Sequence, residues 1–227
     1  MTELTVDRAI EIVGHPSSKD DLAMYFAHDV DSPAAYTGAW FETLDGGGDA
    51  PDHESTITTA DLVAVECLSV HVPIRVGLSL LQGSVGKQFA NWLPEIPTSA
   101  VLGKDDARRH LEPHSPADRA WSCLAEQEGI GWVTAGKLLA RKRPHLIPVW
   151  DRVVRCVCSP PRRENEWLWL DALFREQGGA LPDALAAARE AAGLTDRISI
   201  LRTWDVIVWM RHHKDHRTGR CPGIAVG

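Results

Sequence analysis

Apolar residues recur every three to four positions along most of this chain, the spacing that places them on one face of an α-helix. In the segment that begins at Ser115-Pro116, the side chains of Ala117, Ala120, Trp121 and Leu124 fall on one such face. No segment alternates apolar and polar residues with the period of two that is typical of strands. The pattern therefore predicts an all-α, compact helical fold.

Helix start and stop signals divide this pattern into separate elements. We expect helices at 5–13, 18–28, 35–44, from Thr58 or Thr59 to about 69, from Pro73 to about Leu81, and at 84–93, 116–127, 132–141, 162–177, 181–191 and 196–213. The Gly-rich and acidic segment 45–55 is expected to be a flexible loop within a single domain, 1–227. A proline-containing stretch suggests two possible helical lobes, 1–97 and 113–227.

Composition excludes several classes of protein. Of the 227 residues, 44% are hydrophobic and 24% are charged, which is typical of a globular protein. No apolar run approaches the length of about 20 residues that spans a bilayer, so we expect no membrane partner. The five cysteines are widely spread without a CxxC pair, which favours free thiols and a cytoplasmic location.

Charge is distributed unevenly along the chain. The formal net charge is −7, yet residues 129–163 contain eight basic residues and one acidic residue. Residues 1–60 contain twelve acidic and two basic residues. The basic stretch is therefore a candidate anion-binding surface. The alternative is that it pairs with the acidic N-terminal third of the same chain.

A short glycine-containing connection precedes this basic stretch. Gly129-Ile130-Gly131 joins the helix expected at 116–127 to the helix expected at 132–141, which predicts a helix-hairpin-helix element at 128–132. Such a hairpin exposes unpaired backbone N–H groups at a helix N-terminus, where they can bind a phosphate. On the second helix, Thr134, Lys137 and Arg141 lie on one stripe that could follow a nucleic-acid backbone.

The segment 115–155 resembles the helix-hairpin-helix DNA glycosylases. In those enzymes a Gly-Val-Gly hairpin leads into a helix, and a Pro-Val-Asp about 20 residues later carries the catalytic aspartate. Here Gly129-Ile130-Gly131 matches the hairpin, and Pro148, Val149 and Asp151 match the second motif with Trp150 inserted. The resemblance implies that Asp151 is the catalytic acid. Together, the hairpin, the stripe on the second helix and the basic stretch predict nucleic-acid contacts from these residues: Gly129, Gly131, Thr134, Lys137, Arg141, Lys142, Arg143, Arg152 and Arg155.

Departures from the glycosylase pattern limit the expected chemistry. Bifunctional members place a nucleophilic lysine where this chain has Val133, which cannot form a Schiff base. Lys137, one helical turn further on, could be a substitute. Cys156 and Cys158 cannot supply an iron–sulfur cluster, which needs four cysteines. We therefore expect monofunctional base excision without a metal or cofactor, with Trp150 and Trp132 as candidates for stacking on an extruded base.

Several of these residues also have structural interpretations. Asp151 directly precedes "RVVRCV" and could cap a helix there, a role compatible with catalysis. Asp205 lies in an apolar helix and should be buried and paired with an arginine, most simply one from the basic stretch. His212, His213 and His216 could contribute to a metal site, but a frayed C-terminal tail is the favoured interpretation.

The chain as a whole resembles an uncharacterised bacterial family, domain of unknown function 6308. The segments "DLVAVECLSV" and "KLLARKRPHLIPVWD", and the Trp-Asp of the last helix, carry this likeness. Membership implies no activity. The sequence thus predicts a glycosylase-like enzyme acting on DNA or another nucleic acid. The alternative is a non-catalytic module that binds nucleic acid or an acidic protein.

Overall fold

The computed structural model describes residues 3–27, 31, 36–104, 106–160 and 165–219. Over these residues the chain forms α-helices and short 3-10 helices and contains no strand, so the all-α prediction is confirmed. The α-helices are α1 (Val6–Val13), α2 (Ser18–Tyr25), α3 (Thr59–Glu66), α4 (Ile74–Gln82), α5 (Ser84–Trp92), α6 (Ala107–Leu111), α7 (Pro116–Ala125), α8 (Trp132–Lys142), α9 (Arg152–Cys158), α10 (Glu166–Arg175), α11 (Ala180–Ala191) and α12 (Ile200–Arg217).

Side-chain caps explain why many of these helices begin where they do. The Thr58 hydroxyl accepts a hydrogen bond from the Asp61 N–H, and the Asp61 carboxylate accepts one from the Thr58 N–H, which forms a capping box before α3. Ser115 and Asp151 cap α7 and α9 with a single bond each, because their side chains accept a hydrogen bond from the N–H of Asp118 and of Val154. These starts follow from local sequence and agree with the expected positions.

Three expectations about elements need correction. The expected helix at 35–44 is represented by two 3-10 helices, η1 (Thr37–Trp40) and η2 (Leu44–Gly46), and residue 35 lies outside the described part. Helix α6 was missed because five residues are too few to establish a period. Helix α12 continues to Arg217, so the three histidines lie on its last turns instead of in a frayed tail.

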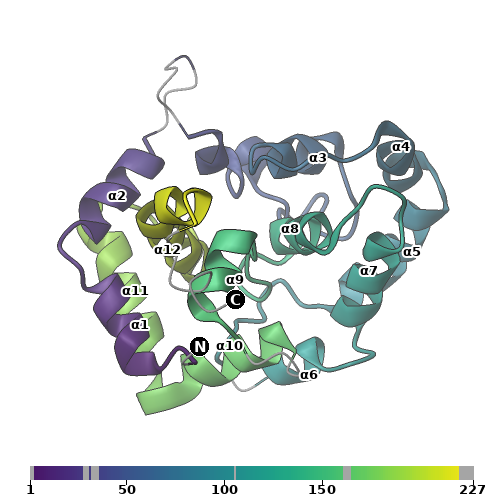
Figure 1. Cartoon of the computed structure of the whole chain (residues 1–227). Coiled ribbons are helices and arrows are strands. Elements are labelled where there is room, and N and C mark those ends of the chain that lie inside the picture. Colours follow the sequence, from purple (N-terminus) through teal and green to yellow (C-terminus); the bar gives the residue numbers. More distant parts are fainter. Residues whose placement is uncertain (1–2, 28–30, 32–35, 105, 161–164, 220–227) are drawn as a thin grey trace.

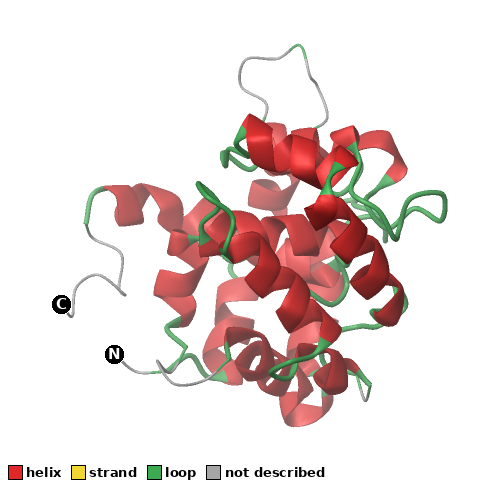
Figure 2. Cartoon of the chain, turned by 90° about the vertical axis from the view of Figure 1, so that its right-hand side faces the viewer, coloured by secondary structure: helices red, strands yellow, loops and turns green. Residues whose placement is uncertain are grey.

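Helix α12 lies at the centre of one half of the molecule and packs against α1, α2, α9 and α11 (Figure 1). Helix α8 packs against α3 on one side and α7 on the other. Figure 2 shows the helical fold turned by 90°, and the buried apolar residues of the described helices form one core cluster. The α3–α8 and α5–α7 contacts bring the two suggested lobes together. The N-terminal third is therefore placed directly against the basic stretch.

The segment 45–55 packs against the C-terminal end of α8. A Cβ atom at Gly48 would lie 2.3 Å from the Arg141 carbonyl oxygen, so only glycine allows this close approach. The His53 carbonyl accepts a hydrogen bond from the Lys142 ammonium at 2.8 Å, and the Glu54 carbonyl accepts one from the Arg143 guanidinium at 2.9 Å. The expectation of a flexible loop at 45–55 did not include these contacts.

None of the helices in the described part of the chain combines the length and the apolar character needed to cross a bilayer. No disulfide joins the four described cysteines, Cys67, Cys123, Cys156 and Cys158.

Candidate active site

The basic run at the end of α8 points into the protein. The side chains of Arg141, Lys142 and Arg143 are each no more than 2% exposed. Asp61 accepts a hydrogen bond from Arg141 Nε at 3.0 Å and from Lys142 Nζ at 3.1 Å, and both side chains of each pair are fully buried. The prediction that these three cations form a nucleic-acid surface is wrong, and the alternative of internal pairing holds for them.

Backbone carbonyls satisfy the remaining donors of these cations. Arg141 donates to the carbonyls of Phe41 and Leu44, and Arg143 donates to those of Ile96, Leu93 and Glu54. Burial lowers the pKa of Lys142, and it lowers the pKa of Arg143 to about 10. Thr134, another predicted contact, is also buried. The basic run at the end of α8 therefore binds the N-terminal third of the chain.

The connection between α7 and α8 keeps its glycines at the surface. Gly129 has a φ of +81°, and a Cβ atom there would lie 2.7 Å from Pro73 Cγ, so both conformation and space require glycine. Ile130 is buried, whereas Gly131 is exposed at the N-cap of α8, where a Cβ atom would meet nothing within 4 Å. Four of the predicted nucleic-acid contacts are exposed: Gly129, Gly131, Arg152 and Arg155.

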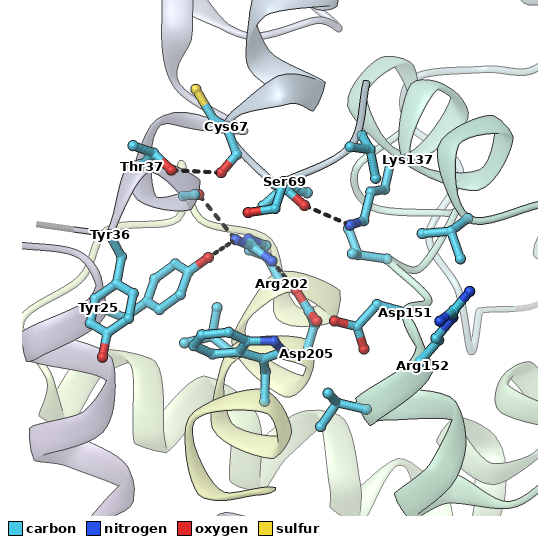
Figure 3. A pocket seen from close by; sticks show the side chains of 18 residues that line it. Tyr25, Tyr36, Thr37, Cys67, Ser69, Lys137, Asp151, Arg152, Arg202 and Asp205 are labelled. Atoms are coloured by element: carbon cyan, nitrogen blue, oxygen red, sulfur yellow. Dashed lines mark hydrogen bonds and ion pairs between the residues drawn. The ribbon is translucent and has the colours of Figure 1, made fainter. Parts of the chain in front are cut away.

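Asp151 both caps a helix and lines a cavity. Its Oδ1 accepts a hydrogen bond from the Val154 N–H at 2.8 Å, which confirms the predicted cap of α9. The same residue lines a cavity of about 450 Å³, called here the Asp151 cavity, which falls in the size range of small-molecule sites. Figure 3 shows the carboxylate turned into this space. The cap fixes one oxygen and leaves Oδ2 available for chemistry.

Lys137 reaches the same cavity from α8 (Figure 3). Its side chain is 5% exposed, and its ammonium donates a hydrogen bond to the Leu68 carbonyl at 2.9 Å. Burial lowers the pKa of Lys137 to about 8, Asp151 opposes this shift, and Arg202 adds to it. The structure therefore places Lys137 in a pocket beside Asp151 and away from any exposed face, contrary to its predicted role as a backbone contact.

Asp205 lines the Asp151 cavity from α12. It is 3% exposed and forms an ion pair with Arg202, so the prediction of a buried acid paired with an arginine is confirmed. The partner lies three residues earlier on the same helix and not in the basic stretch. Arg202 also donates to the Tyr25 hydroxyl at 2.6 Å and to the Gly38 carbonyl at 3.0 Å, which connects α12 to α2 and η1.

Aromatic rings form the wall opposite Asp151. Tyr36 stacks on Tyr25 with ring centroids 5.0 Å apart, and the Trp209 ring meets both edge-on. Sequence reasoning missed these residues. One available signal was that the chain has only two tyrosines, which both line this cavity. The predicted stacking residues Trp150 and Trp132 lie elsewhere, because they line a second, neighbouring cavity.

Comparison with known proteins identifies the family and no activity. The chain matches a family of unknown function (DUF6308) over residues 18–212, and it belongs to that family. No curated protein and no solved structure matches it. The likeness of residues 115–155 to the helix-hairpin-helix DNA glycosylases therefore gains no support from these comparisons and rests on the residues alone.

Proposed function

We propose that the protein is a monofunctional hydrolase of N-glycosidic bonds, acting on a nucleotide of DNA or another nucleic acid whose base enters the Asp151 cavity. The observation that carries the proposal is the dual position of Asp151. Its Oδ1 is fixed by the α9 backbone, and the residue opens into a cavity with an aromatic wall. A carboxylate held in this way is suited to stabilise an oxocarbenium-like transition state.

The reaction needs only water as co-reactant. A water molecule attacks the anomeric carbon of the sugar as the bond to the base breaks, and Asp151 accepts the proton of that water. The base leaves with the bonding electron pair and takes a proton from solvent. Tyr36 and Trp209 supply ring faces and edges against which the base can pack, the role first assigned to Trp150 and Trp132.

Contacts to the nucleic-acid backbone would come from the surface near the cavity. Arg152 is exposed and lines the cavity, and the predicted hairpin exposes Gly129 and Gly131 at the N-terminus of α8. Backbone N–H groups at such a position can bind phosphate. Arg155 is also exposed but forms an ion pair with Glu166. The proposed interface is therefore smaller than the basic stretch suggests.

Replacing Asp151 with asparagine tests the proposal. Asp151→Asn retains the shape and most of the cap, since asparagine caps nearly as well as aspartate. It removes the negative charge, so the rate should fall by about 10²-fold or more. Wild type, Asp151→Asn and the control Asp20→Asn, which changes an exposed aspartate in the first turn of α2, are incubated with duplexes that carry damaged or modified bases. Abasic sites are then counted.

We expect cleavage by wild type and Asp20→Asn but not by Asp151→Asn, with equal melting temperatures for all three. Cleavage that Asp151→Asn retains would remove Asp151 from the mechanism. If the wild type cleaves no substrate but binds nucleic acid in a salt-dependent way, the alternative of a non-catalytic binding module takes its place.

A further inference from the structure

A second cavity, called here the tryptophan cavity, has a volume of about 340 Å³ and shares no lining residue with the Asp151 cavity. Four indole rings line it, from Trp121 on α7, Trp132 on α8, Trp150 before α9 and Trp167 on α10. Trp150 and Trp167 are buried, whereas Trp132 is 37% exposed. The cavity is therefore an aromatic box with one side open to solvent.

The charged groups around the box favour a positive ligand. Asp118 and Glu166 are the acidic lining residues, and Arg155 is the basic one. The Arg155 guanidinium lies over the Trp132 ring, 5.4 Å from its centroid, and forms an ion pair with Glu166. A cation of this chain thus already uses one indole face and one carboxylate. An anion would meet the carboxylates of Asp118 and Glu166.

Helix α8 leaves room for the ligand at Gly136. A Cβ atom at this position would have Trp121 Nε1, at 4.0 Å, as its nearest neighbour, which is an ordinary contact distance. An alanine would therefore fit, but a larger side chain would extend into the space between the indoles. Position 136 allows the cavity to be filled without changing any aromatic or charged residue.

We propose that the tryptophan cavity is a binding site for a small organic cation of the quaternary ammonium class. The faces of several indoles attract such a cation through the ring quadrupole. Because a quaternary ammonium group is weakly hydrated, its desolvation on entering an aromatic box costs little free energy. The carboxylates of Asp118 and Glu166 supply negative charge that attracts the cation. The ligand takes the place of the Arg155 guanidinium over Trp132, and Arg155, which is exposed, swings out toward solvent.

Choline and its neutral isostere 3,3-dimethylbutan-1-ol distinguish a cation site from a merely apolar one. Binding is followed by intrinsic tryptophan fluorescence and by calorimetry. We expect choline to bind and the isostere, which has the same shape without the charge, to bind about 2–30-fold more weakly. Arg155→Ala should tighten choline binding, because it removes the competing cation.

The matched pair Gly136→Ala and Gly136→Leu locates the site. Gly136→Ala should retain choline binding, and Gly136→Leu should abolish it, with circular dichroism confirming that both variants fold. Any one of four results would overturn the proposal: no binding of choline by the wild type at millimolar concentration, equal binding of the isostere, weaker binding by Arg155→Ala, or undiminished binding by folded Gly136→Leu.

Discussion

Lys137 illustrates how much the surroundings of a single residue decide. By spacing it belongs to a polar stripe on α8, yet its ammonium is buried, donates to the Leu68 carbonyl and lies in the Asp151 cavity. Desolvation disfavours the charged form, which is why its pKa falls to about 8 although Asp151 favours the charge. Near neutral pH this amine therefore stands close to the point of losing its proton.

The stability of the protein should depend on this titration. Between pH 8 and the ordinary lysine pKa of 10.5, the unfolded chain holds the proton that the folded protein has released, so wild-type stability rises with pH in that window. Lys137→Met lacks the rise. The wild type should therefore gain up to about 3 kcal/mol in free energy of unfolding over Lys137→Met between pH 8 and 10.5. Urea unfolding at a series of pH values measures this, and parallel curves would contradict it.

At the scale of elements, α8 is held by charge as well as by apolar packing. Its C-terminal end inserts Arg141 and Lys142 around the single carboxylate of Asp61, and backbone carbonyls bind the remaining donors. Asp61 also belongs to the capping box that begins α3. One side chain thus connects the start of α3 to the end of α8.

Asp61→Asn should destabilise the protein by about 3–5 kcal/mol, the usual effect of leaving buried charges uncompensated. The control Glu11→Gln breaks the exposed pair with Arg8 and should change stability by no more than about 0.5 kcal/mol. Denaturant unfolding of the wild type and both variants at neutral pH measures these changes in stability. Equal effects of the two substitutions would show that the α3–α8 ion pairs contribute no more than a surface pair.

At the scale of the whole molecule, internal pairing changes the electrostatic picture of the surface. Three of the eight basic residues counted in 129–163 are buried at the end of α8 and Lys137 is buried beside Asp151, while the net charge of −7 remains. Among the described residues of this stretch, Arg152 and Arg155 are the exposed cations that could contact nucleic acid. Arg152 is exposed and also lines the Asp151 cavity.

Arg152→Ala should weaken nucleic-acid binding and lower the slope of log K against log salt by about 1, as expected for one lost phosphate contact. Lys87→Ala, which removes an exposed base on α5, is the matched control and should leave the slope unchanged. Fluorescence anisotropy with a labelled duplex over a range of salt concentrations measures both. An identical loss for the two variants would indicate binding by overall charge and not through the cavity mouth.

Local spacing by itself determined the helical class and most helix starts. A cap needs only residues three apart, as at Thr58 with Asp61 or at Asp151 with Val154, and amphipathic periods need only a few turns. The short helix α6 was missed because it contains too few residues for a period, and the helix expected at 35–44 is replaced by 3-10 helices at 37–40 and 44–46. The cap at Asp151 and the burial of Asp205 were likewise predicted from the sequence, whereas the catalytic role of Asp151 stays a prediction.

Only the tertiary structure decided which way the charges face and which residues share a cavity. Asp61, the carboxylate partner of Arg141 and Lys142, lies about 80 positions earlier in the chain, and nothing near residue 141 reveals it. The aromatic wall opposite Asp151 comes from Tyr36 and Trp209, which meet because α12 packs against the N-terminal segment. A run of bases looks the same in the sequence whether it faces water or a set of carbonyl oxygens. The free energy that separates the two cases depends on groups that only folding brings together.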